Sequence, residues 1–208
     1  IDSYLCALEK ELKFVAKSQK HKKLQTIYMG GGTPTSVSAE HLKRILNRIN
    51  QEFDLSHLLE FTVEAGRADS ITKEKLEVLK KHGVTRISVN PQTMKDETLK
   101  AIGRRHTVQQ VKDAYVMARE VGFDNINMDI ILGLPGELEV DVENTIEEIK
   151  KLDPDSLTVH SLAIKRASKL SQWIEENGIA TLKNTDRTME IAAAGAEAMQ
   201  MQPYYLYR

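Results

Sequence analysis

The sequence predicts an α/β fold, a partial (β/α) barrel in which parallel strands alternate with outer helices. Short apolar segments typical of buried strands recur about every 30 residues, amphipathic segments lie between them, and no hairpin signal joins two strands. The chain opens on a helix pattern, so we expect the barrel to lack its first strand. A doubly wound sheet is the alternative, but "GGGTPT" after the first strand is not the G-x-G-x-x-G turn of that fold.

The predicted elements follow one another in a regular order. Apolar residues at helical spacing predict a first helix over residues 2–18, and Ser38 and Thr72 are candidate N-caps of the next two helices. Gly83 and Gly122 stand where helices end. Segments rich in β-favouring residues predict strands at 24–29, 58–65, 84–90, 125–133, 155–163 and 203–208. Further helical patterns cover 95–102, 109–121, 141–152, 167–178 and 186–201.

Composition excludes several classes of protein. With 41% hydrophobic and 28% charged residues, the chain can form a core and a polar surface. A net charge of −1 argues against electrostatic binding to nucleic acid or to an anionic membrane. No apolar run is long enough for a membrane span and no signal-peptide pattern is present, so we expect a cytoplasmic location. Because no low-complexity linker divides the chain, residues 1–208 are expected to form one domain.

The cysteine and histidine content argues against disulfides and zinc. Cys6 is the only cysteine, and its simplest interpretation is a small buried residue on the first helix. None of the six histidines lies three to five residues from another, as zinc ligands usually do. We therefore expect no metal to be bound by the residues of this chain.

Polar residues gather at the C-terminal ends of the predicted strands, where α/β proteins bind their ligands. Each alone has a structural explanation, because glycines form turns, a glutamate can cap a loop and a buried aspartate can bind a backbone amide. Their joint placement at one rim favours a binding site instead. The set is Gly30, Gly31, Gly32, Thr33, Glu64, Asn90, Gln92, Asp129, His160 and Ser161.

The chemistry of this rim suggests a small polar ligand with hydroxyl groups and a charged end. Glu64 and Asp129 can accept hydrogen bonds from ribose hydroxyls or from an ammonium group. Arg104 or Arg105 could bind a carboxylate, although either could equally be a solvated surface charge. No serine lies in a nucleophile elbow, so a Ser/His/Asp triad is not indicated and the catalytic residues are unknown.

Longer motifs give the chain a resemblance to a known family. "TIYMGGGTPT", "FTVEAGR", "GVTRISVNPQTM", "IGRRHT" and "GFDNINMDIILGLPGE" resemble the radical S-adenosylmethionine (SAM) enzymes of the oxygen-independent coproporphyrinogen III dehydrogenase (oxidase) family. The resemblance covers almost the whole chain, and "GGGTPT" and "DIILGLPGE" are its most specific parts. "VEAGR" and "NPQTM", where many members read E-x-N-P and G-V-Q-S-F, are closest to the branch found in Gram-positive bacteria.

The resemblance implies a radical SAM type of partial barrel and names residues for the cofactor. In the family the glycine-rich stretch approaches the methionine part of SAM, which implies that Gly31, Gly32 and Thr33 line it. Glu64 and Gln92 match positions that contact the cofactor.

Three further residues carry an implied role. Arg104 matches the position placed for the cofactor's carboxylate. Asp129 would serve the ribose or a second cofactor molecule, and Ala163 would line the adenosyl region.

One part of the family pattern is absent from this chain. The family holds a [4Fe–4S] cluster with three thiolates of a C-x-x-x-C-x-x-C motif, and Cys6 does not belong to such a motif. We therefore expect the chain to be an inactive core fragment, with the cluster motif before Ile1 and a porphyrin-handling part after Arg208.

For the intact protein, the resemblance implies a role in haem biosynthesis. The reduced cluster would cleave SAM to a 5′-deoxyadenosyl radical, which takes hydrogen from a propionate of coproporphyrinogen III and leads to its oxidative decarboxylation to a vinyl group. The implied partners are this porphyrinogen and an electron donor protein. The alternatives are a haem chaperone of the same family and an unrelated barrel with a phosphate site at the glycine loop.

The expected missing strand has a consequence for association. The strand "LQTIYM" would present unpaired backbone groups along one side, and such an open edge favours pairing with another chain. A dimer through this edge is therefore expected at high concentration.

Overall fold

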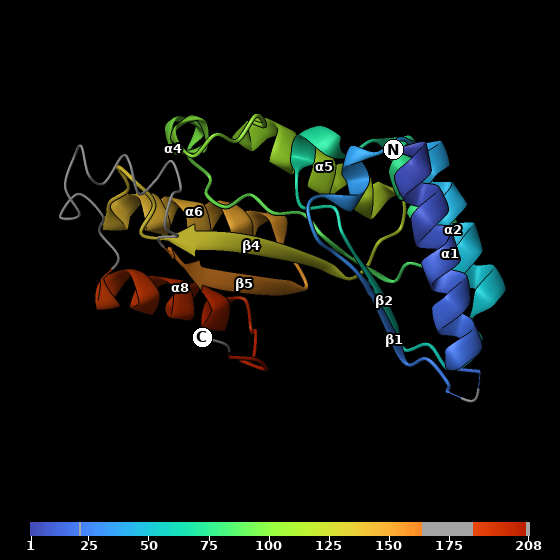
Figure 1. The fold of residues 1–208 in the computed structure, drawn as a ribbon. Helices are drawn as coiled ribbons and strands as arrows, with labels where there is room; N and C mark the ends of the chain where they lie inside the picture. Colours follow the sequence, from blue (N-terminus) through green and yellow to red (C-terminus); the bar gives the residue numbers. More distant parts are fainter. Residues whose placement is uncertain (21, 164–184, 207–208) are drawn as a thin grey trace. The chain divides into compact units, whose positions relative to one another are not determined.

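The computed structural model describes residues 1–20, 22–163 and 185–206 and shows an α/β fold with five parallel strands (Figure 1). The strand order follows the sequence, and the chain between successive strands is mainly helical. Among the described residues the strands do not close into a barrel, because β1 and β5 each have one strand neighbour. The predicted alternation is confirmed. The strands are β1 (Thr26–Met29), β2 (Glu60–Glu64), β3 (Arg86–Ser88), β4 (Ile126–Leu132) and β5 (Ser156–Ser161).

The chain divides into two compact units. The first consists of Ile1–Val89 and Ala114–Ile126, and the second of Asn90–Asp113 and Asn127–Arg208. The division therefore falls within helix α5 (Val108–Glu120) and after the first residue of β4. The expected single domain over residues 1–208 stays a prediction.

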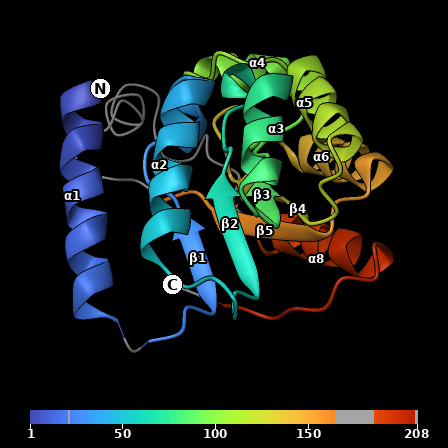
Figure 2. The ribbon, with the colours of Figure 1, turned by 90° about the vertical axis from the view of Figure 1, so that its right-hand side faces the viewer.

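In the first unit, β1, β2 and β3 run in parallel, with Met29 opposite Val63 and Glu64 opposite Ser88. Helix α2 contacts both α1 and α3 (Figure 2). The three central residues of β2 are buried, whereas β1 alternates between exposed and half-buried residues. The helices are α1 (Asp2–Ser18), α2 (Ala39–Glu52) and α3 (Lys73–Lys81). Fully buried side chains of this unit include Leu42, Leu46, Phe61, Val63, Leu76 and Leu79.

The helix ends of the first unit follow the predicted caps. The Ser38 hydroxyl accepts a hydrogen bond from the His41 N–H at 3.3 Å, and the Thr72 hydroxyl accepts one from the Lys75 N–H at 3.3 Å. Gly83 ends α3 with a φ of 84°, which a side chain would disfavour. These three predictions are confirmed.

In the second unit, β4 and β5 pair in parallel from Asn127–Ser156 to Leu132–Ser161. Helix α6 contacts α8, and Gly195 of α8 lies so close to Ile146 of α6 that a Cβ would collide with it. Thr185 caps α8 by accepting from the Thr188 N–H at 3.3 Å. The helices are α4 (Asp96–Ala101), α6 (Glu139–Leu152), α8 (Asp186–Ala198) and the first part of α5.

One predicted strand is wrong. Residues 203–206 form no regular structure, and Tyr204, Tyr205 and Leu206 are exposed. No described strand forms a hydrogen-bonded pair with them, and β propensity alone does not make a strand without such a partner. The helix predicted over 167–178 lies outside the described residues. No helix in the described ranges is long and apolar enough to cross a membrane.

Candidate functional site

Each of the three consecutive glycines after β1 has a different environment. A Cβ on Gly30 would collide with the ring of Tyr28 and lie 3.2 Å from the carboxyl carbon of Glu64. Gly31 has a φ of 106°, which strongly favours glycine. Gly32 has neither constraint, because its φ is outside the positive range and no described atom lies within 4 Å of an added Cβ. Packing explains Gly30 and backbone conformation explains Gly31, but no described contact explains Gly32.

The carboxylate of Glu64 is held at the end of β2 by a neighbouring strand. Tyr28 of β1 donates its phenolic hydrogen to Glu64 Oε1, although the Tyr28 side chain is largely exposed. The two residues lie on adjacent parallel strands, so the register of β1 and β2 brings them together. Glu64 is half-buried, and its carboxylate oxygens can accept further hydrogen bonds next to the glycines.

A polar cluster anchors the loop after β1 to the loop after β2. The hydroxyls of Thr35 and Ser70 lie 2.6 Å apart. Lys75 Nζ donates to the backbone oxygens of Thr35 at 2.7 Å and Ser70 at 2.9 Å. Burial lowers the pKa of Lys75 below its usual value. Thr33 begins this anchored segment, so the glycines are followed by a fixed stretch of chain.

In the second unit, Gln92 has an unusual backbone conformation. Its φ is 67°, its side chain is buried, and its backbone pairs with β4 beside Ile130. The Gln92 backbone N–H donates to the backbone carbonyl oxygen of Asp129 at 3.0 Å, and the Gln92 carbonyl accepts from the Ile131 N–H at 2.9 Å. A left-handed glutamine is strained, and strain of this kind is concentrated at functional sites.

Asp129 of β4 belongs to a hydrogen-bonded group with β5. Asn127 Nδ2 donates to Asp129 Oδ1 at 2.5 Å, while Asn127 Oδ1 accepts from the hydroxyls of Ser156 at 2.9 Å and Thr158 at 3.2 Å. His160 Nε2 lies 3.9 Å from the other oxygen of Asp129. The carboxylate is thus oriented by Asn127 and remains half-buried.

The remaining predicted residues of the second unit follow its helices and strands. Arg104 comes after α4 and Gly103, and its N–H donates to the Leu99 oxygen at 2.8 Å. Ala163 follows β5 and is exposed. The Oδ1 atom of Asn90 is buried, and no group among the described residues hydrogen-bonds to it.

The two units therefore each hold part of the predicted set. The first unit brings Gly31, Gly32 and Thr33 to the end of β1 and Glu64 to the end of β2. The second unit joins the backbones of Gln92 and Asp129, and Arg104 and Ala163 follow its elements. That these residues bind one ligand stays a prediction.

Sequence reasoning did not identify Tyr28 and Asn127 as members of these groups. A signal was present for each residue. Asn127 lies two residues before Asp129 in a strand, so the two side chains share a face. Tyr28 is a large aromatic residue next to the glycines on an edge strand, where its ring needs room.

The described residues contain no cluster of metal-ligating side chains. Cys6 is exposed on α1, and Arg44 Nη2 donates to its sulfur at 3.0 Å. The interpretation of Cys6 as a buried residue is therefore wrong, because its sulfur is exposed and contacts the polar guanidinium of Arg44 instead of apolar core residues.

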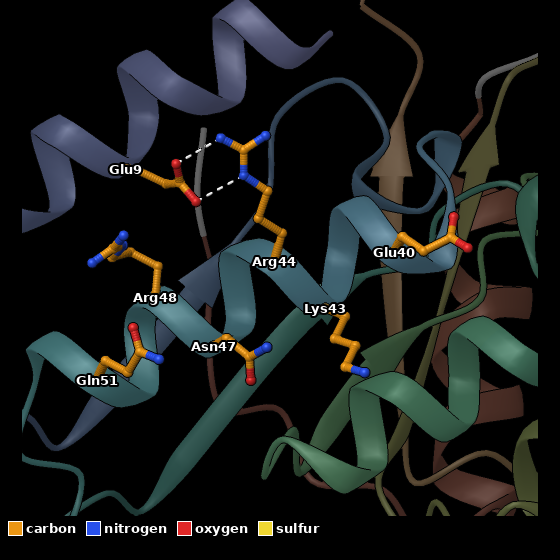
Figure 3. A pocket seen from close by; sticks show the side chains of 7 residues that line it. All are labelled: Glu9, Glu40, Lys43, Arg44, Asn47, Arg48 and Gln51. Carbon is orange, nitrogen blue, oxygen red and sulfur yellow. Dashed lines mark hydrogen bonds and ion pairs between the residues drawn. The ribbon is translucent and has the colours of Figure 1, made fainter.

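A separate cleft of about 370 Å³ is lined by residues of α1 and α2 in the first unit (Figure 3). Glu9 and Arg44 form a two-pronged ion pair across it at 2.8 and 2.7 Å, and the guanidinium lowers the pKa of Glu9. None of the predicted ligand residues lines this cleft. Its lining residues are Glu9, Glu40, Lys43, Arg44, Asn47, Arg48 and Gln51.

Comparisons with known proteins agree on one family. The family model described as "Radical SAM superfamily" matches residues 8–149. The oxygen-independent coproporphyrinogen-III oxidase-like protein HemZ of Bacillus subtilis (strain 168) is 44% identical over 100% of this chain and 42% of its own length. The heme chaperone HemW of the same organism is 41% identical over 79% of this chain and 44% of its own length.

A solved structure has the same fold. Coproporphyrinogen III oxidase (HemN) from Escherichia coli superimposes with a TM-score of 0.81 at 24% identity, covering 96% of this chain and 45% of that chain. The chain thus spans less than half the length of each of these three proteins.

Proposed function

The chain belongs to the radical SAM superfamily, and on this premise we propose that the predicted ligand residues of its two units bind S-adenosylmethionine. Gly32 is the observation that carries the proposal. The described protein atoms leave open space around it and give its backbone no need for glycine, as expected where a ligand approaches the main chain. Gly31 and Thr33, on either side of it, would line the same group.

The other proposed residues fit the chemical groups of this cofactor. Glu64, held by Tyr28, offers a carboxylate to the ammonium group or to a ribose hydroxyl. Gln92 and Asp129 offer fixed polar groups, of which Asp129 suits a ribose diol. Arg104 would bind the carboxylate, and Ala163 would lie against the adenosyl part. When bound, SAM supplies one-electron chemistry that removes a hydrogen atom from a substrate.

The residues of this chain do not fit the [4Fe–4S] cluster that radical SAM enzymes use. Three thiolates are needed, and the sequence contains one cysteine, which is exposed beside Arg44. In this proposal the residues of the chain bind and orient SAM and do not supply the thiolates of the cluster.

For the whole protein we propose the oxidative decarboxylation of coproporphyrinogen III, with an external protein as electron donor. The similarity over the entire chain to HemZ, which is named as a coproporphyrinogen-III oxidase-like protein, supports this proposal. A haem chaperone is the second candidate, supported by the 41% identity to HemW. Association through the open edge of β1 and a cytoplasmic location stay predictions.

Ligand-dependent melting of the full-length protein tests the proposed site. SAM should raise the melting temperature, because a ligand that binds only the folded state stabilises it, and phosphate should not. Stabilisation by phosphate alone would favour the unrelated phosphate-binding barrel.

An anaerobic activity assay then separates the two whole-protein candidates. Consumption of coproporphyrinogen III in the presence of SAM and a reductant supports the dehydrogenase. Tight, stoichiometric haem binding in an absorbance titration, without any decarboxylation, would support the chaperone instead.

A further inference from the structure

Glu137 is a buried carboxylate in the turn after β4, and only 3% of its surface is exposed. Its N–H donates to the Leu134 oxygen at 3.1 Å, which fixes the turn. The Thr93 hydroxyl donates to Glu137 Oε1 at 2.5 Å, and the Thr98 hydroxyl also hydrogen-bonds to the carboxylate. One side chain thus joins the turn to two segments that lie earlier in the sequence.

Both threonines are linked to proposed cofactor residues. Thr93 directly follows Gln92, whose strained backbone must be held in place. Thr98 lies in α4, whose C-terminal end leads through Gly103 to Arg104. Thr145 of α6 completes the group, because its hydroxyl lies 3.3 Å from that of Thr93 and accepts from the Met94 N–H at 3.1 Å.

A contribution to folding stability does not by itself explain why the ionisable carboxyl group of Glu137 lies at this buried position. Burial raises the pKa of Glu137 above its usual value, and the nearby charge of Asp141 raises it further. The hydrogen bonds from Thr93 and Thr98 and the charge of Lys95 act in the opposite direction, but Lys95 is itself paired with Asp141 at 2.9 Å.

The raised pKa has a defined sign for stability. The folded state binds the proton more tightly than the unfolded state, so stability falls as the pH rises from the usual glutamate range through the raised pKa. Ionisation of the buried carboxyl is therefore a net cost to folding stability. An amide of the same size would avoid this cost.

We propose that Glu137 is a positioning residue for the cofactor, which holds Gln92 and the segment before Arg104 in a fixed relation to the turn after β4. This role rests on the proposed SAM site. Glu137 acts through Thr93 and Thr98 and does not itself touch the cofactor.

Equilibrium binding of SAM to variants of the full-length protein tests this role. Glu137→Leu should weaken SAM binding about tenfold, because the leucine cannot accept the hydrogen bonds from Thr93 and Thr98 that position the site. Glu137→Gln should lose about threefold, because its carbonyl still accepts one hydrogen bond. Glu143→Gln, which removes the same charge from an exposed position on α6, should bind as the wild type does.

Melting temperature and pH dependence separate positioning from a general structural role. Glu137→Gln should melt no lower than the wild type at neutral pH. Its affinity and that of the wild type should converge as the pH falls, because protonation makes the wild-type carboxyl resemble the amide. An affinity deficit that is constant at every pH, or that follows a loss of melting temperature, would overturn the role.

The remaining outcomes distinguish the two proposals. If Glu137→Leu does not fold, the Glu137→Gln variant decides alone. If the wild-type protein binds SAM and the Glu137 variants bind it with the same affinity, the positioning role alone is overturned. No SAM binding by the wild type would overturn the proposed function, and the positioning role with it.

Discussion

The predicted ligand residues of the two units are held in different ways. In the first unit, the loop after β1 carries three glycines, and the largely exposed Tyr28 fixes Glu64. In the second unit, backbone pairing fixes Gln92, and the side chain of Asn127 orients Asp129. One unit offers open space and the other offers fixed polar groups. An atom added at Gly32 should therefore impair binding without loss of stability, whereas polar groups lost from the second unit should remove specific interactions.

Arg104→Ala is expected to have the largest effect on binding. Loss of a charge-assisted hydrogen bond to the cofactor carboxylate should weaken SAM binding by about 1.5–3 kcal/mol. Calorimetric titration of the full-length protein measures this change, with Arg105→Ala at the neighbouring exposed position as the control. Equal affinities in the Arg104 and Arg105 variants would remove Arg104 from the site.

Gly30→Ala should lower stability, in contrast to a substitution in the open part of the same glycine loop. Its Cβ would collide with Tyr28, so the free energy of unfolding should fall by about 1–3 kcal/mol, as for other overpacked positions. Urea unfolding measures the loss. The same substitution at Gly32, where the space is open, is the control. A stable Gly30→Ala protein would show that the Tyr28 ring moves aside freely.

Tyr28→Phe should have a smaller effect, confined to the first unit. The ring and its packing remain, and Glu64 loses one hydrogen bond, so SAM affinity should fall by about 0.5–1.5 kcal/mol. Because Tyr28 is largely exposed, the melting temperature should hardly change. If affinity is unchanged, Glu64 either needs no support or makes no contact with the cofactor.

Local sequence signals predicted much of the fold. The sequence predicts Ser38 and Thr72 as N-caps because a hydroxyl just before a helix pattern commonly accepts a hydrogen bond from the first turn. It predicts Gly83 at a helix end because the residue after a helix often has a left-handed conformation, which favours glycine. The segment 203–206 was mispredicted because β propensity does not reveal whether a partner strand is present.

The internal contacts of the candidate site were not predictable in the same way. Tyr28 and Glu64 are 36 residues apart, and Thr93 and Glu137 are 44 apart, so only the folded chain brings each pair together. The sequence placed Glu64 at the end of its strand, as the structure does, because the strand pattern stops there. It also placed Asp129 at a strand end, but Asp129 lies in the middle of β4, because the buried strand continues past the charge to Leu132. It could not show that packing against Tyr28 explains Gly30 and that a positive φ explains Gly31, because both depend on the folded shape of the loop.

The SAM affinity of Gly32→Ala in the full-length protein, with its stability measured in parallel, tests the central claim most directly. The added methyl group meets no described protein atom, so stability should be unchanged or should rise by about 0.4–1 kcal/mol. If the cofactor occupies that space, binding should weaken about tenfold, because the methyl group takes the room of the ligand. Wild-type affinity in a stable Gly32→Ala protein would contradict the claim that this loop approaches the cofactor.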